Sequence, residues 1–228
     1  MRSLHFKAVG LLLALSASSG TAQQIDSPYR FVDPGQQVNA FIGAIETDVG
    51  TLGLGPESDV AYGLRYGIRL TGPFSVEAAA TVFPTARAIQ DTVISGADTS
   101  LVATGVEADM TIAVLAADLR FDLTGSRTWN RLMPYALLGV GAAFKLSEDD
   151  AADESLEPNV RYDFGTRLVG ELGVGIEWLP VDRFALRLDA RNMLWKIEAP
   201  PALQSLEDAP SEEWVQNFLL SAGVSFRF

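Results

Sequence analysis

The sequence contains no cysteine, and its one histidine, His5, stands within the first seven residues. Without cysteine the chain forms neither disulfides nor a thiolate metal site. The segment that carries His5 is predicted below to be removed, so the mature chain has no histidine and cannot build a Ser-His or Asp-His mechanism. We therefore expect a non-enzymatic protein with no catalytic residue, no cofactor and no metal centre.

Positive charge and long apolar runs are also scarce. The 228 residues hold 17 Lys and Arg against 29 Asp and Glu, a formal net charge of −12, and the isoelectric point is about 4.5. Such a chain has no basic surface to neutralise phosphates, which excludes nucleic acid as a partner. No stretch after the N-terminus approaches the roughly 18 continuous apolar residues of a spanning helix. The length suits one domain with a large core or one closed barrel.

The N-terminus has the three parts of a secretory signal peptide. Residues 1–7 carry positive charge, residues 8–17 are apolar, and Gly20-Thr21-Ala22 supplies small residues for cleavage. This pattern predicts a signal peptide at 1–22, a mature chain that begins at Gln23, and export from the cytoplasm. A polar lead with two prolines follows at 23–37.

The C-terminal segment alternates between an apolar and a polar face. One face carries Phe218, Leu220, Ala222, Val224, Phe226 and Phe228. The other carries Asn217, Ser221, Gly223, Ser225 and Arg227, with Leu219 as the one apolar exception. A period of two predicts a strand with one apolar side. Its end on a bare aromatic residue is typical of the closing strand of a membrane β-barrel.

The same alternation predicts seven further strands, at 38–45, 60–70, 74–82, 115–123, 134–146, 162–178 and 184–191. Short turns alternate with long polar segments at 46–59, 84–109, 147–160 and 197–213. This layout predicts an all-β fold: an eight-stranded antiparallel transmembrane β-barrel at 38–228, with short periplasmic turns and long extracellular loops. The lead at 23–37 would then lie in the periplasm.

Alternation alone also fits a soluble barrel that turns its apolar face inward. Two features favour the membrane barrel. The polar faces are rich in small residues, and their cations are nearly all arginine, whereas a solvated surface would use lysine freely. After Lys7 the only lysines are Lys145 and Lys196, both near predicted strand ends.

Aromatic residues on the apolar faces mark two levels. Beside the short turns or the C-terminus stand Phe74, Phe121, Trp178, Phe184, Phe226 and Phe228. At the opposite level we expect Tyr62, Phe144, Tyr162 and Trp214. Two such levels predict the aromatic girdles that sit at the two membrane interfaces.

The inward faces carry seven cations and six anions, predicted to form a barrel-interior charge network: Arg65, Arg69, Glu77, Asp118, Arg120, Asp122, Arg167, Glu171, Glu177, Arg187, Asp189, Arg191 and Arg227. An eight-stranded barrel is only wide enough for side chains to fill. Charges there must pair, because an isolated charge in a medium of low dielectric constant is costly. We expect a salt-bridged plug; the alternative is a narrow pore that favours cations.

The chain resembles the small OmpA/OmpX-like outer-membrane β-barrel family. The resemblance rests on Pro134-Tyr135 before Gly139-Val140-Gly141, on Gly173-Val174-Gly175 before Trp178-Leu179-Pro180, on Arg187-Leu188-Asp189-Ala190-Arg191 and on Phe228. It covers the chain from about residue 38. The family implies an outer-membrane location among phospholipid and lipopolysaccharide, and a terminal strand read by the barrel-assembly machinery.

The long loops are acidic. They hold 19 of the 29 acidic residues and Arg87 as their only cation. The plain interpretation is a solvated, repulsive rim; weak capture of divalent cations is the alternative. Because long loops often carry function, we expect a monomeric barrel with a structural or surface-interaction role.

Overall fold

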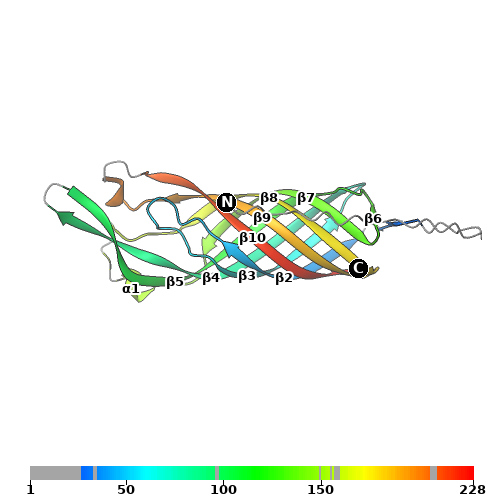
Figure 1. The fold of residues 1–228 in the computed structure, drawn as a ribbon, viewed down its shortest axis with the longest axis horizontal. Coiled ribbons are helices and arrows are strands. Elements are labelled where there is room, and N and C mark those ends of the chain that lie inside the picture. Colours follow the sequence, from blue (N-terminus) through cyan, green and yellow to red (C-terminus); the bar gives the residue numbers. More distant parts are fainter. Residues whose placement is uncertain are drawn as a thin grey trace, which may run out of the picture.

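The computed structural model describes residues 27–32, 35–95, 98–148, 150–154, 156, 160–205 and 210–228, with the side chains at 90–103 and 205 left aside. The predicted signal peptide lies outside the described residues. Eight long strands form the fold (Figure 1): β2 Gln36–Glu46, β3 Asp59–Arg69, β4 Phe74–Ser95, β5 Asp98–Asp122, β7 Leu132–Lys145, β8 Thr166–Val181, β9 Phe184–Glu198 and β10 Glu212–Arg227.

The eight strands close into an antiparallel barrel. Each long strand pairs with the next one along the chain, β5 with β7, and β10 closes the ring against β2 from Phe218↔Glu46 to Arg227↔Gln37. The predicted fold class is confirmed. Two short strands, β1 Tyr29–Phe31 in the N-terminal lead and β6 Arg127–Trp129 in the β5–β7 connection, pair with each other beside the short-turn end.

The outer and inner faces of the barrel follow the predicted alternation. Outward side chains such as Leu64 and Leu168 are apolar and exposed, at 58% and 75% of their surface. Inward positions on the same strands, among them Arg65 and Arg167, are buried. A soluble barrel would show the reverse arrangement, because water would have to cover its outside. The described residues contain no helix that is long and apolar enough to cross a bilayer.

The structure corrects the prediction that residues 84–109 form a loop. It continues β4 and β5 as a long hairpin that stays paired to Ser95↔Asp98, with an irregularity between Ala88 and Gln90. Figure 1 shows this hairpin projecting past the barrel at the end opposite the C-terminus. Hydrophobic alternation did not reveal it, because strands outside the bilayer need no continuous apolar face. Backbone pairing is enough to hold them.

The short connections lie at one end and the long ones at the other. The short end holds residues 70–73, the β6 segment and residues 182–183. The long end holds residues 47–58, the β4–β5 hairpin, residues 146–165 with α1 Ala151–Glu154, and residues 199–211 with the 3₁₀ turn η1 Leu203–Ser205. The strand predicted to end at residue 191 continues to Glu198, so Lys196 lies within β9.

Candidate functional site

The charged part of the barrel interior is centred on Arg187 of β9. Its guanidinium donates to both carboxylate oxygens of Glu77 on β4, and its Nε donates to Asp189 Oδ2 at 2.8 Å. The Tyr135 hydroxyl on β7 donates to Asp189 Oδ1 at 2.6 Å. These contacts join three strands across the lumen. Planar guanidinium groups suit such sites, because one fork can bind two carboxylate oxygens at once.

Arg191 and Arg65 extend this cluster. Arg191 lies 2.7 Å from Glu77 and from Asp118, and 2.9 Å from Glu171. Arg65 lies 3.0 Å from Asp189. It also donates to Asn39 and Ser221 at 3.1 and 3.0 Å.

A second layer lies nearer the short-turn end. Arg120 binds Asp122 at 2.7 Å and Glu177 at 2.6 Å, and its guanidinium stacks 3.8 Å above the Tyr135 ring. Arg69 approaches Asp122 at 2.9 Å, and Arg227 approaches Glu177 at 2.5 Å. Because the two layers bring six arginines and six carboxylates together, the network is formally neutral.

A glycine makes room for the Tyr135 ring at the junction of the two layers. A Cβ added at Gly175 would lie 2.2 Å from the Tyr135 hydroxyl and 2.7 Å from the Leu188 carbonyl oxygen. No side chain fits there, so the inward glycine of β8 allows the ring to cross the lumen. The tyrosine can then stack on Arg120 and orient Asp189.

Arg167 is the one predicted network residue that the structure keeps apart from the others. Its guanidinium pairs with Glu198 at 2.7 Å and donates to the carbonyl oxygens of Phe164 and Asp163. Position 167 is the second residue of β8, so it lies at the long-loop mouth, beyond the reach of the interior carboxylates. The other twelve predicted side chains form the network.

The half of the interior toward the long loops is apolar. Its buried cluster contains Phe41, Ile45, Leu54, Ala61, Phe83, Met110, Ile112, Val114, Ala143, Tyr162, Phe164, Val169, Met193, Trp195, Ile197, Ala199, Leu203, Val215 and Leu219. Phe164 and Trp195 meet edge to face, with ring centroids 6.2 Å apart. Sequence reasoning missed this cluster. Its one signal was Leu219, the apolar exception on the inward face of the last strand, which is fully buried.

The structure also corrects the prediction that Tyr162 belongs to the outer girdle. It precedes β8 and folds inward onto the apolar cluster, where 5% of its surface is exposed. Burial raises the pKa of its phenol to about 12. The Arg87 guanidinium lies 5.2 Å from its ring centroid.

The acidic loop after β7 is tied to the barrel through α1. Asp153, one of the acidic residues predicted to be solvated, is buried and forms an ion pair with Arg87 on β4. Among the described residues, no group of three or more acidic side chains is placed to hold a metal ion. Asp149 and Glu157 lie outside the described residues.

The predicted interface aromatics lie on the outside of the barrel. At the short-turn end, Phe74 packs on Phe121 with centroids 5.4 Å apart, and Phe226 packs on Phe184 and Phe228 at 5.2 and 6.1 Å. Trp178 is also exposed. At the opposite end, Trp214 is exposed beside the Lys196 ammonium, 5.4 Å from its ring, Tyr62 is exposed and Phe144 is half-buried.

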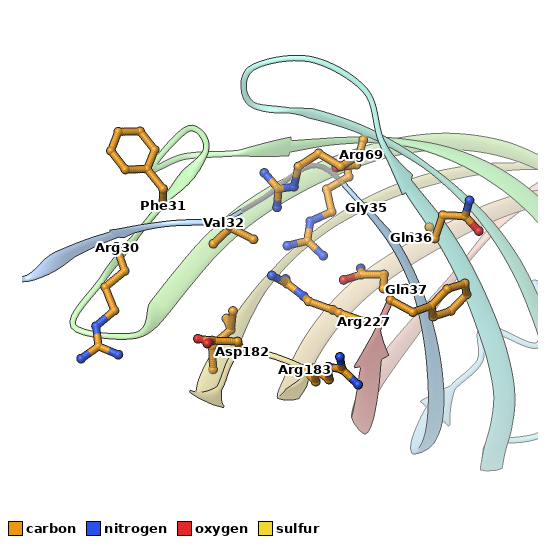
Figure 2. A pocket seen from close by; sticks show the side chains of 15 residues that line it. Arg30, Phe31, Val32, Gly35, Gln36, Gln37, Arg69, Asp182, Arg183 and Arg227 are labelled. Atoms are coloured by element: carbon orange, nitrogen blue, oxygen red, sulfur yellow. The ribbon is translucent and has the colours of Figure 1, made fainter.

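The short-turn end opens into a pocket of about 740 Å³. Arginines from four strands and one turn line it, and among the described lining residues Asp182 is the only acidic one. Figure 2 shows Arg69 and Arg227 pointing into the pocket, with Asp182 and Arg183 at its rim. The charged layer of Arg120 forms its inner limit.

A closed barrel with an apolar exterior and paired charges inside defines an integral β-barrel membrane protein. The chain matches the family model of the outer membrane protein beta-barrel domain over residues 9–228, and it belongs to that family. It is therefore a small outer-membrane protein, and its short-turn end faces the periplasm.

Three solved structures are among those that match the chain. OprG from Pseudomonas aeruginosa is 16% identical, with 89% of this chain and 99% of that chain covered and a TM-score of 0.53. Neisserial surface protein A is 14% identical, with 89% and 98% covered and a TM-score of 0.49. The N-terminal barrel of Pseudomonas aeruginosa OprF is 12% identical, with 86% and 99% covered and a TM-score of 0.48. No curated protein sequence matches the chain.

Proposed function

We propose that this protein is a non-enzymatic, non-conducting barrel that presents its extracellular loops as an interaction surface. The observation that carries the proposal is the filling of the lumen by two successive plugs. Paired charges occupy the periplasmic half, and a buried apolar cluster occupies the extracellular half. An ion would have to cross both, and passage through the apolar cluster would remove most of its hydration.

The extracellular part is built to hold a defined shape. The β4–β5 hairpin extends the barrel wall outward (Figure 1). The Arg87–Asp153 pair fastens the β7–β8 loop, and Glu213 accepts hydrogen bonds from the Thr51 backbone N–H and hydroxyl at 2.8 and 2.7 Å. Lys196 joins Glu212 at 2.5 Å. Ordered loops on a rigid scaffold are a common basis for recognition.

The interior charges support a structural role better than catalysis. Acid–base or nucleophilic catalysis needs a reactive group that substrate can reach. Here Glu77, Glu177 and Asp189 are buried and bound by arginine. Such pairing holds the strands in register and leaves the carboxylates inaccessible to substrate.

The proposal also includes the expected partners. The outer-membrane location supplies phospholipid contact. We also propose that the barrel contacts lipopolysaccharide and that the barrel-assembly machinery recognises the β10 strand and Phe228. The acidic loops would capture divalent cations weakly, and the protein would be a monomer. Light scattering of the detergent-solubilised protein tests the monomer.

The alternative is a narrow pore, and the periplasmic pocket of about 740 Å³ favours it as a ready entrance. Planar-bilayer recording on folded, inserted protein distinguishes the two. We expect no single-channel steps from the wild type. Stable steps whose size changes in Arg120→Ala or Arg187→Ala would replace our proposal with the pore.

A further inference from the structure

The periplasmic pocket has more positive than negative charge along its walls. Its lining includes Arg30, Arg69, Arg120, Arg183 and Arg227, and Asp182 is the only acidic side chain among the described lining residues. Arg30 and Arg183 are exposed, and neither has an ion-pair partner within the described part of the chain.

The excess extends into the charged layer beneath the pocket. That layer contains Arg69, Arg120 and Arg227 but only Asp122 and Glu177, so one cation is uncompensated. The deeper layer has the opposite imbalance, with Arg65, Arg187 and Arg191 facing four carboxylates. The neutral network is thus polarised, with its positive end toward the periplasm.

Several donors at this positive end have no hydrogen-bond partner within the part of the chain that the structure describes. Arg120, 1% exposed, uses Nε and Nη1 for Asp122 and Glu177, and its Nη2 is buried without a partner. Arg69 Nη1, and Nε and Nη1 of Arg227, are likewise unpartnered. A buried charged donor without an acceptor is costly, so an oxyanion that accepted from these groups would recover free energy.

We propose that this pocket is a binding site for a phosphate group that enters from the periplasm. Guanidinium forks match the oxygen geometry of phosphate, and several of them around one concave site can share its charge. The volume falls within the range of small-ligand sites, so either free phosphate or the phosphate of an inner-leaflet phospholipid headgroup fits. Modest rotation of the Arg69 and Arg227 side chains would aim their free N–H groups at the ligand.

The test uses the full mature chain, refolded in a maltoside detergent that contains no phosphate and labelled with ¹⁵N at arginine. Inorganic phosphate is titrated in one arm and short-chain phosphatidylglycerol in the other, at constant ionic strength. We expect saturable shifts of the Nε–H resonances of Arg69, Arg120, Arg227 and Arg183. Saturation with phosphate identifies a soluble ligand, and saturation with the lipid alone identifies a headgroup site.

Variants assign the binding to the pocket. Arg183→Gln changes an exposed turn residue outside the network and leaves the fold intact, and we expect it to weaken binding roughly tenfold. Arg131→Gln is the matched control, because Arg131 is exposed on the same side, donates to the Pro180 carbonyl oxygen and does not line the pocket. Absence of saturable shifts in both arms, or equal effects of the two variants, overturns the proposal.

Discussion

The two halves of the barrel interior are filled by opposite chemistries, one apolar and one charged. Along the inward face of β5, Met110, Ile112 and Val114 give way to Asp118 and Arg120. Along β9, Ile197, Trp195 and Met193 give way to Arg191 and Asp189 in the same direction. Outward residues of these strands are apolar beside the charged half, whereas beside the apolar half they include Asp109 and Thr111 on β5 and Asn192 and Lys196 on β9.

This difference shows that the bilayer dictates only the outer face of a narrow barrel. Inside, any filling is acceptable if it packs densely or satisfies its own polar groups. The apolar half resembles the core of a soluble protein, and its stability depends on volume. The stability of the charged half depends on its ion pairs. The halves should therefore respond differently to substitution.

The largest effect is expected in the charged half. Arg187→Met removes the cation shared by Glu77 and Asp189, and an uncompensated buried charge destabilises a protein by about 3–5 kcal/mol. Urea unfolding of the liposome-inserted protein, followed by tryptophan fluorescence, measures it. Adding Glu77→Gln should recover part of the loss. A single variant as stable as the wild type would mean that pairing does not hold this half together.

Next comes a substitution in the apolar half. Leu219 is fully buried, so Leu219→Ala opens a cavity and should lower the free energy of unfolding by about 3 kcal/mol. Leu219→Met preserves volume and should cost much less. The outward neighbour Leu220, which is 56% exposed on the outer face, supplies the matched control as Leu220→Ala. Equal losses at 219 and 220 would contradict an interior core.

The same comparison explains what the sequence could predict. Where the inward face is charged, alternation is clear, and the strand from 115 to 123 and the strand from 184 were recognised correctly. Where the inward face is apolar, polar residues such as Thr111 on β5 and Lys196 on β9 face outward, so the apolar and polar positions of the alternation exchange places. The prediction therefore started the first of these strands at 115 and ended the second at 191, although β5 and β9 continue through the apolar cluster.

The residues of the candidate site could likewise be predicted only in part. Twelve network residues could be found because strand parity alone assigns a side chain to the lumen. Arg167 also faces the lumen, but it lies nearer the long-loop end of the barrel than the network does. Its position along the barrel axis depends on where β8 begins, which strand parity does not predict. Tyr162 and Asp153 lie in the β7–β8 connection, Asp153 in the single turn α1, and no periodicity there indicates which way a side chain points. Asp153 is buried with its ion-pair partner Arg87 and Tyr162 is buried in the apolar cluster, so the burial of both depends on residues distant in sequence.

A smaller and more local effect is expected where the apolar half meets the loops. Arg87→Gln leaves Asp153 without its cation and should loosen α1 by about 1–2 kcal/mol. Hydrogen exchange of the Glu154 amide, which donates to the Asp150 carbonyl oxygen, reports this opening. Lys196→Gln is the control, because it removes an ion pair at the same end of the barrel, with Glu212, that does not involve α1. Unchanged exchange in Arg87→Gln would show that the pair does not fasten the loop.

The smallest effect concerns the Tyr162 hydroxyl, which is buried in the apolar cluster and has no hydrogen-bond partner among the described residues. Tyr162→Phe removes that unpaired group, so stability at neutral pH should stay within about 1 kcal/mol of the wild type.

The pKa of the phenol is about 12 in the folded protein and near 10 when unfolded. The unfolded state therefore loses its proton first, and this residue's contribution to stability declines as the pH rises from about 10 to 12. Urea unfolding at pH 8 and pH 11 should show a smaller loss in Tyr162→Phe than in the wild type. Tyr62→Phe, on the outer face, should keep the wild-type pH dependence; if the two variants behave alike, Tyr162 is not buried in the folded protein.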